Sequence, residues 1–199
     1  MAEALLRIAA TEGLQSASMR AVAAEAGVSL RLVQYYFTTK QALLLDAFAR
    51  LGVQHQARMD RWVRAAGSPP RPRSTVTAIL SSILPTDEES RRITRIYAAY
   101  YTLVLGDSSL EEHATPQPDL LEGFLTQQLR SAQEAGAIDP EKDPAMTAAG
   151  LLAMVNGFGS SVLGGQRTGE EALAIVRHHL DELFGPAREE RDGPRPDSR

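Results

Sequence analysis

The sequence predicts an all-helical protein, on three observations. Alternating apolar and polar runs, which are typical of strands, are almost absent from the 199 residues. Apolar residues recur three and four positions apart through most of the chain. Ser or Thr precedes many of these segments and Gly or Pro follows them, as helix caps and stops do. We expect an N-terminal three-helix domain over residues 1–45, a second helical domain over 46–185 and a disordered tail over 186–199.

Three short helices and a long one are expected first. Each has a Ser or Thr cap before it or a Gly after it. The expected ranges are residues 1–12, 19–26, Leu30–Tyr36 and 40–66, with caps at Ser18, Ser29 and Thr39. At about 1.5 Å per residue, the fourth helix is long enough to leave one domain and enter another. The Gly- and Pro-rich segment 67–72 ends it.

The later helices are predicted from apolar stripes. Two stripes are Ile93, Ile96, Tyr97, Tyr100, Tyr101 and Val104, and Leu121, Phe124, Leu125, Gln128, Leu129 and Ala132. A third helix is expected from Ala145 to Leu163. The last begins at Thr168, whose spacing to Glu171 is that of a capping box. Its inward residues are Ala172, Val176, Leu180 and Leu183.

Residues 18–37 have the pattern of a helix-turn-helix. Ala23 is small, as a closely crossing helix requires, and Gly27 permits the positive φ of a sharp turn. The crossing is expected to be held by the apolar residues Val22, Val28 and Val33. The side chains left outward, which can reach a DNA major groove, are Arg31, Gln34 and Tyr35, with Ser29 and Leu30 at the leading end. On spacing alone, an ordinary helical hairpin remains the alternative.

Five sequence words around this motif carry a family resemblance. They are Ile8-Ala9-Ala10, Gly13-Leu14, Ser18-Met19-Arg20-Ala21-Val22-Ala23, Ala26-Gly27-Val28-Ser29 and Phe37-Thr38-Thr39-Lys40-Gln41-Ala42-Leu43-Leu44. Through them, the segment from Ala4 to Phe48 resembles the N-terminal domain of the TetR family of bacterial regulators. Beyond that segment only the length and the helix layout agree.

The resemblance implies a homodimeric transcriptional regulator. Its third helix would lie in a major groove of a pseudo-palindromic double-stranded DNA operator, and a small-molecule effector in the C-terminal domain would release it from that operator. Repression is the default that the family implies. The DNA-facing positions carried over are Arg20, Ser29, Leu30, Arg31, Gln34, Tyr35, Tyr36 and Lys40. Arg31 is expected to donate to a guanine edge, and Tyr36 and Lys40 to hold phosphates.

Three departures from the family pattern bear on DNA binding. Gln34 stands where members usually have Tyr, and Tyr36 where they often have His. Members commonly carry a basic arm before the first helix, whereas this sequence starts almost at that helix, so we expect a modest salt dependence. A helical small-molecule-binding or interaction protein with a weakened DNA-binding head remains the alternative function.

A stripe of small residues predicts how two subunits meet. The stripe repeats every fourth position as Ala149, Ala153, Gly157, Ser161 and Gly165. Small residues let another helix approach closely. Together with the apolar face from Ala172 to Leu183, the helix from Ala145 to Leu163 is expected to form a four-helix bundle across a two-fold axis. Packing within one chain is the alternative.

The effector site is predicted from aromatic residues with a few polar groups among them, as in pockets for small organic molecules. The candidate ligand-binding residues are His55, Trp62, Tyr97, Tyr101, Phe124, Gln128 and Asn156. The stripes contain no pair of acidic residues that would indicate a metal site. We expect a neutral or weakly polar, partly aromatic ligand. The same aromatic residues also fit an ordinary core, and His55 a structural histidine.

Composition excludes several other functions. The chain has no Cys, so thiolate catalysis, disulfides and Cys-ligated metals are excluded. Its net charge is −4. We find no phosphate-binding loop, zinc-protease motif or nucleophile elbow, and we expect neither enzymatic activity nor a metal or cofactor. The uncharged segment 144–166 is diluted by Gly, Ser and Asn, which favours a buried helix over a membrane span. The protein is expected to be cytoplasmic.

Overall fold

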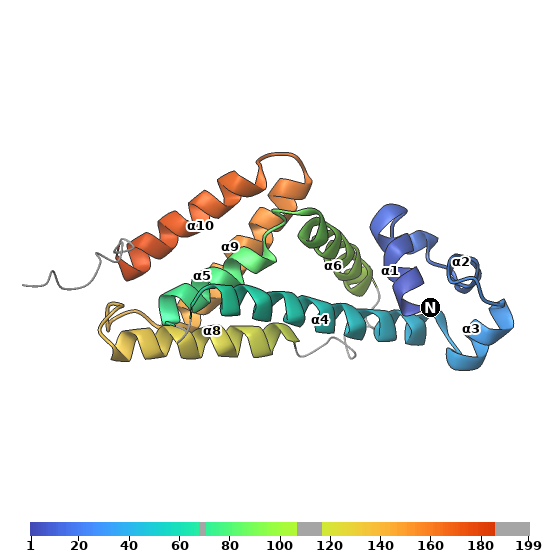
Figure 1. The fold of residues 1–199 in the computed structure, drawn as a ribbon, viewed down its shortest axis with the longest axis horizontal. Helices are drawn as coiled ribbons and strands as arrows, with labels where there is room; N and C mark the ends of the chain where they lie inside the picture. The colour runs from blue at the N-terminus through green and yellow to red at the C-terminus, as the bar shows by residue number, and fades with distance from the viewer. Residues whose placement is uncertain (68–70, 107–116, 186–199) are drawn as a thin grey trace, which may run out of the picture.

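The computed structural model describes residues 1–67, 71–106 and 117–185, and within them every regular element is a helix. The α-helices are α1 (Ala2–Thr11), α2 (Met19–Glu25), α3 (Leu30–Tyr36), α4 (Lys40–Ala65), α5 (Pro72–Ile83), α6 (Glu88–Gly106), α8 (Gln117–Glu134), α9 (Pro144–Leu163) and α10 (Gly169–Phe184), and a short 3-10 helix covers Leu14–Ser16. The molecule is elongated, with α1–α3 at one end and α10 toward the other (Figure 1). The predicted all-helical fold is confirmed; the predicted tail lies outside the described residues.

The predicted caps set the starts of the N-terminal helices. The Ser18, Ser29 and Thr39 hydroxyl oxygens each accept a hydrogen bond from the backbone N–H three residues later, at 3.0–3.2 Å. Each cap satisfies a donor that the first helical turn leaves free, which typically contributes about 1 kcal/mol. These bonds join close neighbours in sequence, and sequence alone could therefore predict them.

The turn between α2 and α3 closes around Gly27. Its φ of 66° lies in the left-handed region, where a side chain would be strained. The N–H of Val28 donates to the carbonyl of Ala23 at 3.0 Å, which ends α2 in a Schellman-type turn. Val22 and Val33 are fully buried beneath the crossing. The predicted helix-turn-helix geometry is confirmed, with α3 held rigidly on α2.

Two clusters of buried side chains divide the molecule differently from the expected boundary at residue 45. The first cluster contains α1–α3 and the first half of α4, and it also takes in Ile93, Ile96 and Tyr100 of α6. The second joins α5, α8, α9 and α10 to Met59 near the far end of α4. The long helix α4 thus spans both clusters, and α6 packs against α1 rather than only within the second domain.

Helix α5 was not predicted from the sequence. The segment 67–72 was interpreted as a break, but Pro72 occupies the first turn of a new helix, a position that Pro favours. Val76, Ile79 and Leu80 are buried at helical spacing, and this period was the available signal. Helix α5 contacts α4, α6, α8, α9 and α10, and so forms the centre of the C-terminal half (Figure 1).

Two aromatic residues predicted to face inward lie at the surface. Tyr101 on α6 is 52% exposed and Phe124 on α8 is 47% exposed. The apolar stripe on each helix is wider than the part of the helix surface that neighbouring helices cover. Tyr100 and Leu125, one position away, take the buried places, and Tyr101 and Phe124 stay outside. Periodicity identifies the apolar face of a helix but not how much of that face is covered.

Candidate functional site

The predicted reading face is the outer side of α3. Its inner side carries Val33, which is fully buried, so the opposite side points away from the protein. Arg31 and Gln34 are exposed there, and Tyr35 and Tyr36 are 78% and 64% exposed. The two tyrosine rings meet edge to face with centroids 5.2 Å apart, which restrains both side chains. This end of the molecule therefore presents a preorganised polar and aromatic surface.

The remaining DNA-facing candidates lie on or next to α3 in the sequence. Arg20 on α2 and Lys40 at the first turn of α4 are exposed, and Ser29 is the cap of α3. Leu30 differs from the others, because it is half-buried and packs against the first hydrophobic cluster. One exposed residue of α3 was absent from the prediction: Leu32, which is 40% exposed and lies one helical turn from Tyr35 and Tyr36.

Of the predicted effector residues, His55 of α4 and Tyr97 of α6 are brought together. Their rings lie 5.7 Å apart and both side chains are half-buried. Burial lowers the pKa of His55, and the nearby Arg58 charge adds to the effect. Burial, with smaller contributions from Tyr101 and Tyr100, raises the pKa of Tyr97 to about 12. Both groups are therefore neutral at physiological pH and suit a neutral ligand better than an ion.

The lowered pKa of His55 predicts a stability that depends on pH. Because the folded state binds this proton less readily than the unfolded chain does, stability is lost as the pH falls through and below the unfolded value of about 6.5. One proton corresponds to a slope of at most about 1.4 kcal/mol per pH unit. Urea unfolding between pH 5.5 and 7.5 should show a shallower slope for His55→Gln than for the wild type. Equal slopes for the two proteins would contradict a lowered pKa of His55 in the folded state.

The structure places the other predicted effector residues in different surroundings. The Trp62 ring is covered by the guanidinium of Arg58, at 5.9 Å from the ring centroid, and Gln128 is half-buried on α8. Tyr101 and Phe124 are exposed on α6 and α8. Asn156 lies on the exposed side of α9, because its neighbour Val155 takes the buried place and one residue turns a helix by about 100°. Asn156 therefore belongs to the face predicted for dimer contact.

A cluster of charges around the buried Arg58, which the sequence analysis missed, joins α4 to the start of α6. Arg58 is only 4% exposed and donates to Asp87 at 2.5 Å, Glu89 at 2.8 Å and the Ser82 carbonyl at 3.2 Å. Burial acts to raise the pKa of Asp87, but the N–H of Ser90 and the Arg58 charge outweigh it and lower that pKa. No local pattern marks Arg58, since its partners lie about thirty positions along the chain.

One side of α9 is left uncovered by the other residues that the structure describes. Met146, Gly150, Ala153, Gly157 and Ser160 are exposed along it, and an added Cβ at Gly150 or Gly157 would meet nothing within 4 Å. By length and hydropathy α9 could cross a bilayer, yet only 28% of its most apolar window is buried within the chain. Of the predicted stripe, Ala149 and Ser161 are half-buried.

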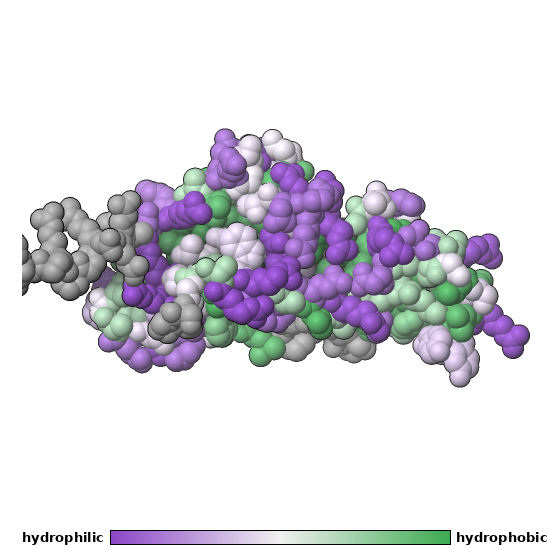
Figure 2. Space-filling view, viewed as in Figure 1, coloured by the Kyte–Doolittle hydropathy of each residue, from purple (hydrophilic) through white to green (hydrophobic). Residues whose placement is uncertain are grey.

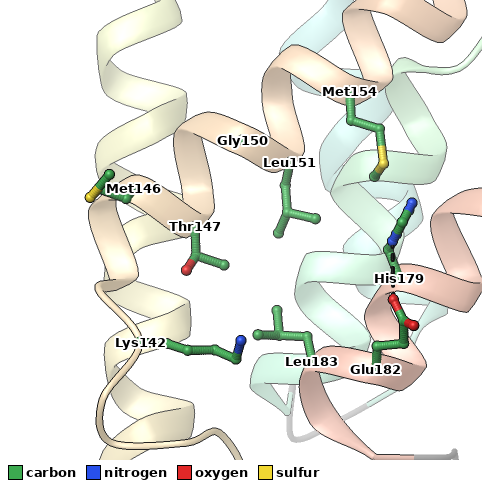
Figure 3. Close-up of a pocket in the computed structure, with 9 residues that line it drawn as sticks. All are labelled: Lys142, Met146, Thr147, Gly150, Leu151, Met154, His179, Glu182 and Leu183. Atoms are coloured by element: carbon green, nitrogen blue, oxygen red, sulfur yellow. Dashed lines mark hydrogen bonds and ion pairs between the residues drawn. The ribbon is translucent and has the colours of Figure 1, made fainter.

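A shallow groove of about 320 Å³ adjoins this exposed side, between α9 and α10 (Figure 3). Its lining is Lys142, Met146, Thr147, Gly150, Leu151, Met154, His179, Glu182 and Leu183. Apolar side chains of both helices point into it, and the ring of His179 lies 3.3 Å from the Glu182 carboxylate at one edge. The groove is separate from His55 and Tyr97, so it belongs to the face of α9 and α10 and not to the predicted effector site.

Comparison with known proteins identifies both parts of the chain. Residues 2–47 match the model for bacterial regulatory proteins of the tetR family, and residues 72–185 match the C-terminal model of BetI-type transcriptional repressors. The chain belongs to the TetR family. The resemblance seen in the N-terminal segment is thereby confirmed, and both family models describe transcriptional regulators.

Similar regulators cover the chain to different extents. The transcriptional regulator PksA of Bacillus subtilis is 37% identical over 100 residues, which span 50% of this chain and 47% of PksA. BetI of Agrobacterium fabrum is 28% identical over 163 residues, 79% of this chain and 72% of BetI. The chain thus spans about half the length of the first of these relatives.

Solved structures share the whole fold. A transcriptional regulator from Rhodococcus sp. RHA1 has a TM-score of 0.78 at 28% identity, with 92% of each chain covered. One from Saccharomonospora viridis, solved in complex with choline, has a TM-score of 0.79 at 21% identity, covering 91% of this chain and 93% of that one. Helix α9 is accordingly a helix of a regulator fold, and these neighbours give no indication of a membrane-protein fold.

Proposed function

We propose that this TetR-family regulator represses transcription by placing two copies of α3 in successive major grooves of a pseudo-palindromic operator. The observation that carries the proposal is the outer face of α3, where Arg31, Gln34 and Tyr35 project while Val33 anchors the helix from below. A rigid helix with exposed hydrogen-bonding side chains is what base readout in the major groove requires. The operator is expected to have half-sites about one helical turn apart.

Within this surface, base contacts are assigned to Arg31, Gln34 and Tyr35, and backbone contacts to Arg20, Ser29, Tyr36 and Lys40. The exposed guanidinium of Arg31 can donate two hydrogen bonds to one guanine, and exposed Lys40 adds a positive charge at the start of α4. Leu30 is half-buried against the first hydrophobic cluster, and we propose that it positions the start of α3 and does not contact DNA.

Two substitutions separate these roles. Arg31→Ala should reduce discrimination at one base pair of each half-site by about 1–3 kcal/mol and leave other positions unchanged. Lys40→Ala should weaken binding to all sequences alike and lower the slope of log K against log salt by about two units, one for each subunit of the dimer. Fluorescence anisotropy on single-base variants of a selected operator, at several salt concentrations, measures both effects. If Arg31→Ala weakens every variant equally, Arg31 contacts phosphate and not a base.

The homodimer is proposed to form through α9 and α10, covering the exposed side of α9 and the groove beside it. The exposed small residues of α9 favour close helix approach, and the apolar lining of the groove can receive a side chain of the partner subunit. Burial in a dimer also accounts for a helix as apolar as α9 being mostly uncovered in one subunit. Two α3 helices could then reach one DNA duplex from the opposite end of the molecule (Figure 1).

The effector is proposed to bind where α4 and α6 meet, beside His55 and Tyr97. Helix α6 packs on α1, and α4 leads directly into the reading head, so a ligand that spreads these helices would move α3. Such a ligand releases DNA only if it binds the DNA-incompetent arrangement more tightly. The neutral state of both rings supports a neutral or weakly polar ligand. Because one structural neighbour binds choline, thermal shifts with choline and its uncharged carbon analogue would test the ligand class.

The site of action follows from the target. A regulator that binds chromosomal operators acts in the cytoplasm, and we propose this location for the protein. DNA binding itself is tested by selecting fragments from random double-stranded DNA with the purified chain at low salt and without effector. A pool that gains no enriched sequence would contradict the proposed function.

A further inference from the structure

Among helices α1–α3, which we call the reading head, one exposed apolar side chain has no part in the hydrogen bonds or phosphate contacts proposed above. Among the described residues of α1–α3, the exposed large hydrophobic side chains are Leu32, Tyr35 and Tyr36, and all three lie on α3. The tyrosines carry hydroxyl groups that can bond to DNA, but Leu32 can make only van der Waals contacts. Its backbone N–H is already bonded to Ser29 Oγ at 3.2 Å.

The position of Leu32 places it within the surface that faces DNA. Residues three and four apart on a helix are neighbours on one side, so Leu32 lies beside Tyr35 and Tyr36. Apolar patches lie among hydrophilic side chains at the end of the molecule formed by α2 and α3 (Figure 2). The proposed dimer helices α9 and α10 lie far from α3, so a second subunit does not cover Leu32 (Figure 1).

We infer that Leu32 is a specificity-determining residue that contacts the 5-methyl group of a thymine in each half-site of the operator. Of the four bases, only thymine presents an apolar group in the major groove. Contact with that methyl removes apolar surface of both partners from water, whereas a cytosine at the same place would leave Leu32 against a polar amino group. The inference rests on the proposed placement of α3 in the major groove.

The test removes the methyl group from the DNA and the leucine from the protein in a double-mutant cycle. An operator is first selected from random DNA with the wild-type chain, and each thymine is then replaced in turn by deoxyuridine, which lacks only the methyl. Losing one buried methyl should weaken binding about fourfold per half-site, or on the order of 15-fold for a symmetric pair. With Leu32→Ala, the same replacement should change the affinity less than about twofold.

Two matched variants sharpen the result. Val53→Ala removes another exposed apolar side chain, 68% exposed on α4, and should keep the full deoxyuridine effect. Tyr35→Ala should bind DNA more weakly overall but also keep that effect. The assignment is overturned if Leu32→Ala retains the deoxyuridine effect, or if Tyr35→Ala abolishes it in place of Leu32→Ala. A selection that enriches no DNA at all refutes operator binding itself, which distinguishes that failure from a wrong role for Leu32.

Discussion

Gly157→Glu should convert the protein from a dimer to a monomer and lower its affinity for a palindromic operator by about 10²- to 10⁴-fold. Gly157 is exposed on α9, and beyond its own helix backbone an added Cβ meets nothing within 4 Å among the residues that the structure describes, so one subunit accommodates the larger side chain. A two-fold contact along α9 would bring two such carboxylates together in an apolar interface, where neither finds a partner. Binding then loses the second reading head, which otherwise acts at a high effective concentration.

Gly123→Glu is the matched control for this experiment. Gly123 is also exposed within a helix, α8, with open space around an added Cβ, so the two substitutions have the same chemistry and differ in the face they occupy. Sedimentation analysis and operator binding should both leave Gly123→Glu close to wild type. A wild-type monomer that binds a palindrome tightly, or a Gly157→Glu variant that remains dimeric, would show that α9 is not the dimer contact. Ser161 suits the test less well, because Arg167 donates to its hydroxyl at 2.9 Å within the subunit.

The combined variant Asp87→Asn and Glu89→Gln should lower the free energy of unfolding by about 1–3 kcal/mol, because Arg58 is buried while both carboxylates are partly exposed to screening water. Both replacements keep the shape and one oxygen acceptor of each side chain, but they remove the charges that neutralise Arg58. A guanidinium that is only 4% exposed would then be buried without a counter-charge, which is costly in a medium of low polarity. Urea unfolding followed by circular dichroism measures the change.

Two further variants identify the cause of that loss. Arg58→Met on the same background removes the buried charge as well, and should recover most of the lost stability, since an apolar side chain of similar length can fill the site. Arg61→Ala removes the neighbouring arginine, whose side chain is 54% exposed and pairs with Glu89 at the surface, and should cost less than about 0.5 kcal/mol. If Arg58→Met gives no recovery, the unpaired charge is not the reason for the destabilisation.

The cluster around Arg58 also bears on how the proposed effector site is connected to helices α1–α3. Arg58 fixes the second half of α4 to the start of α6, while Gln54, one turn earlier, donates to Glu3 of α1 at 2.7 Å and accepts from Arg92 of α6 at 3.2 Å. His55 lies between these two polar contacts on α4. A ligand beside His55 and Tyr97 would therefore act on helices that are tied to each other and to α1 by polar bonds as well as by packing.

The sequence by itself determined the parts of this protein that depend on near neighbours. The caps at Ser18, Ser29, Thr39 and Thr168, the positive φ of Gly27 and the buried Val33 follow from residues at most five positions apart, as local backbone hydrogen bonds and helical periodicity do. The exposed outer face of α3, to which we assign DNA reading, could be predicted for the same reason.

Only the tertiary structure decided which apolar faces are covered and which distant charges meet. It placed Asn156 on the open side of α9, left Tyr101 and Phe124 exposed, and buried Arg58 against carboxylates about thirty residues away. It also joined α6 to the core of the reading head. Burial and ion pairing depend on how helices assemble in space, and a periodic pattern in one helix does not specify which neighbour will cover it.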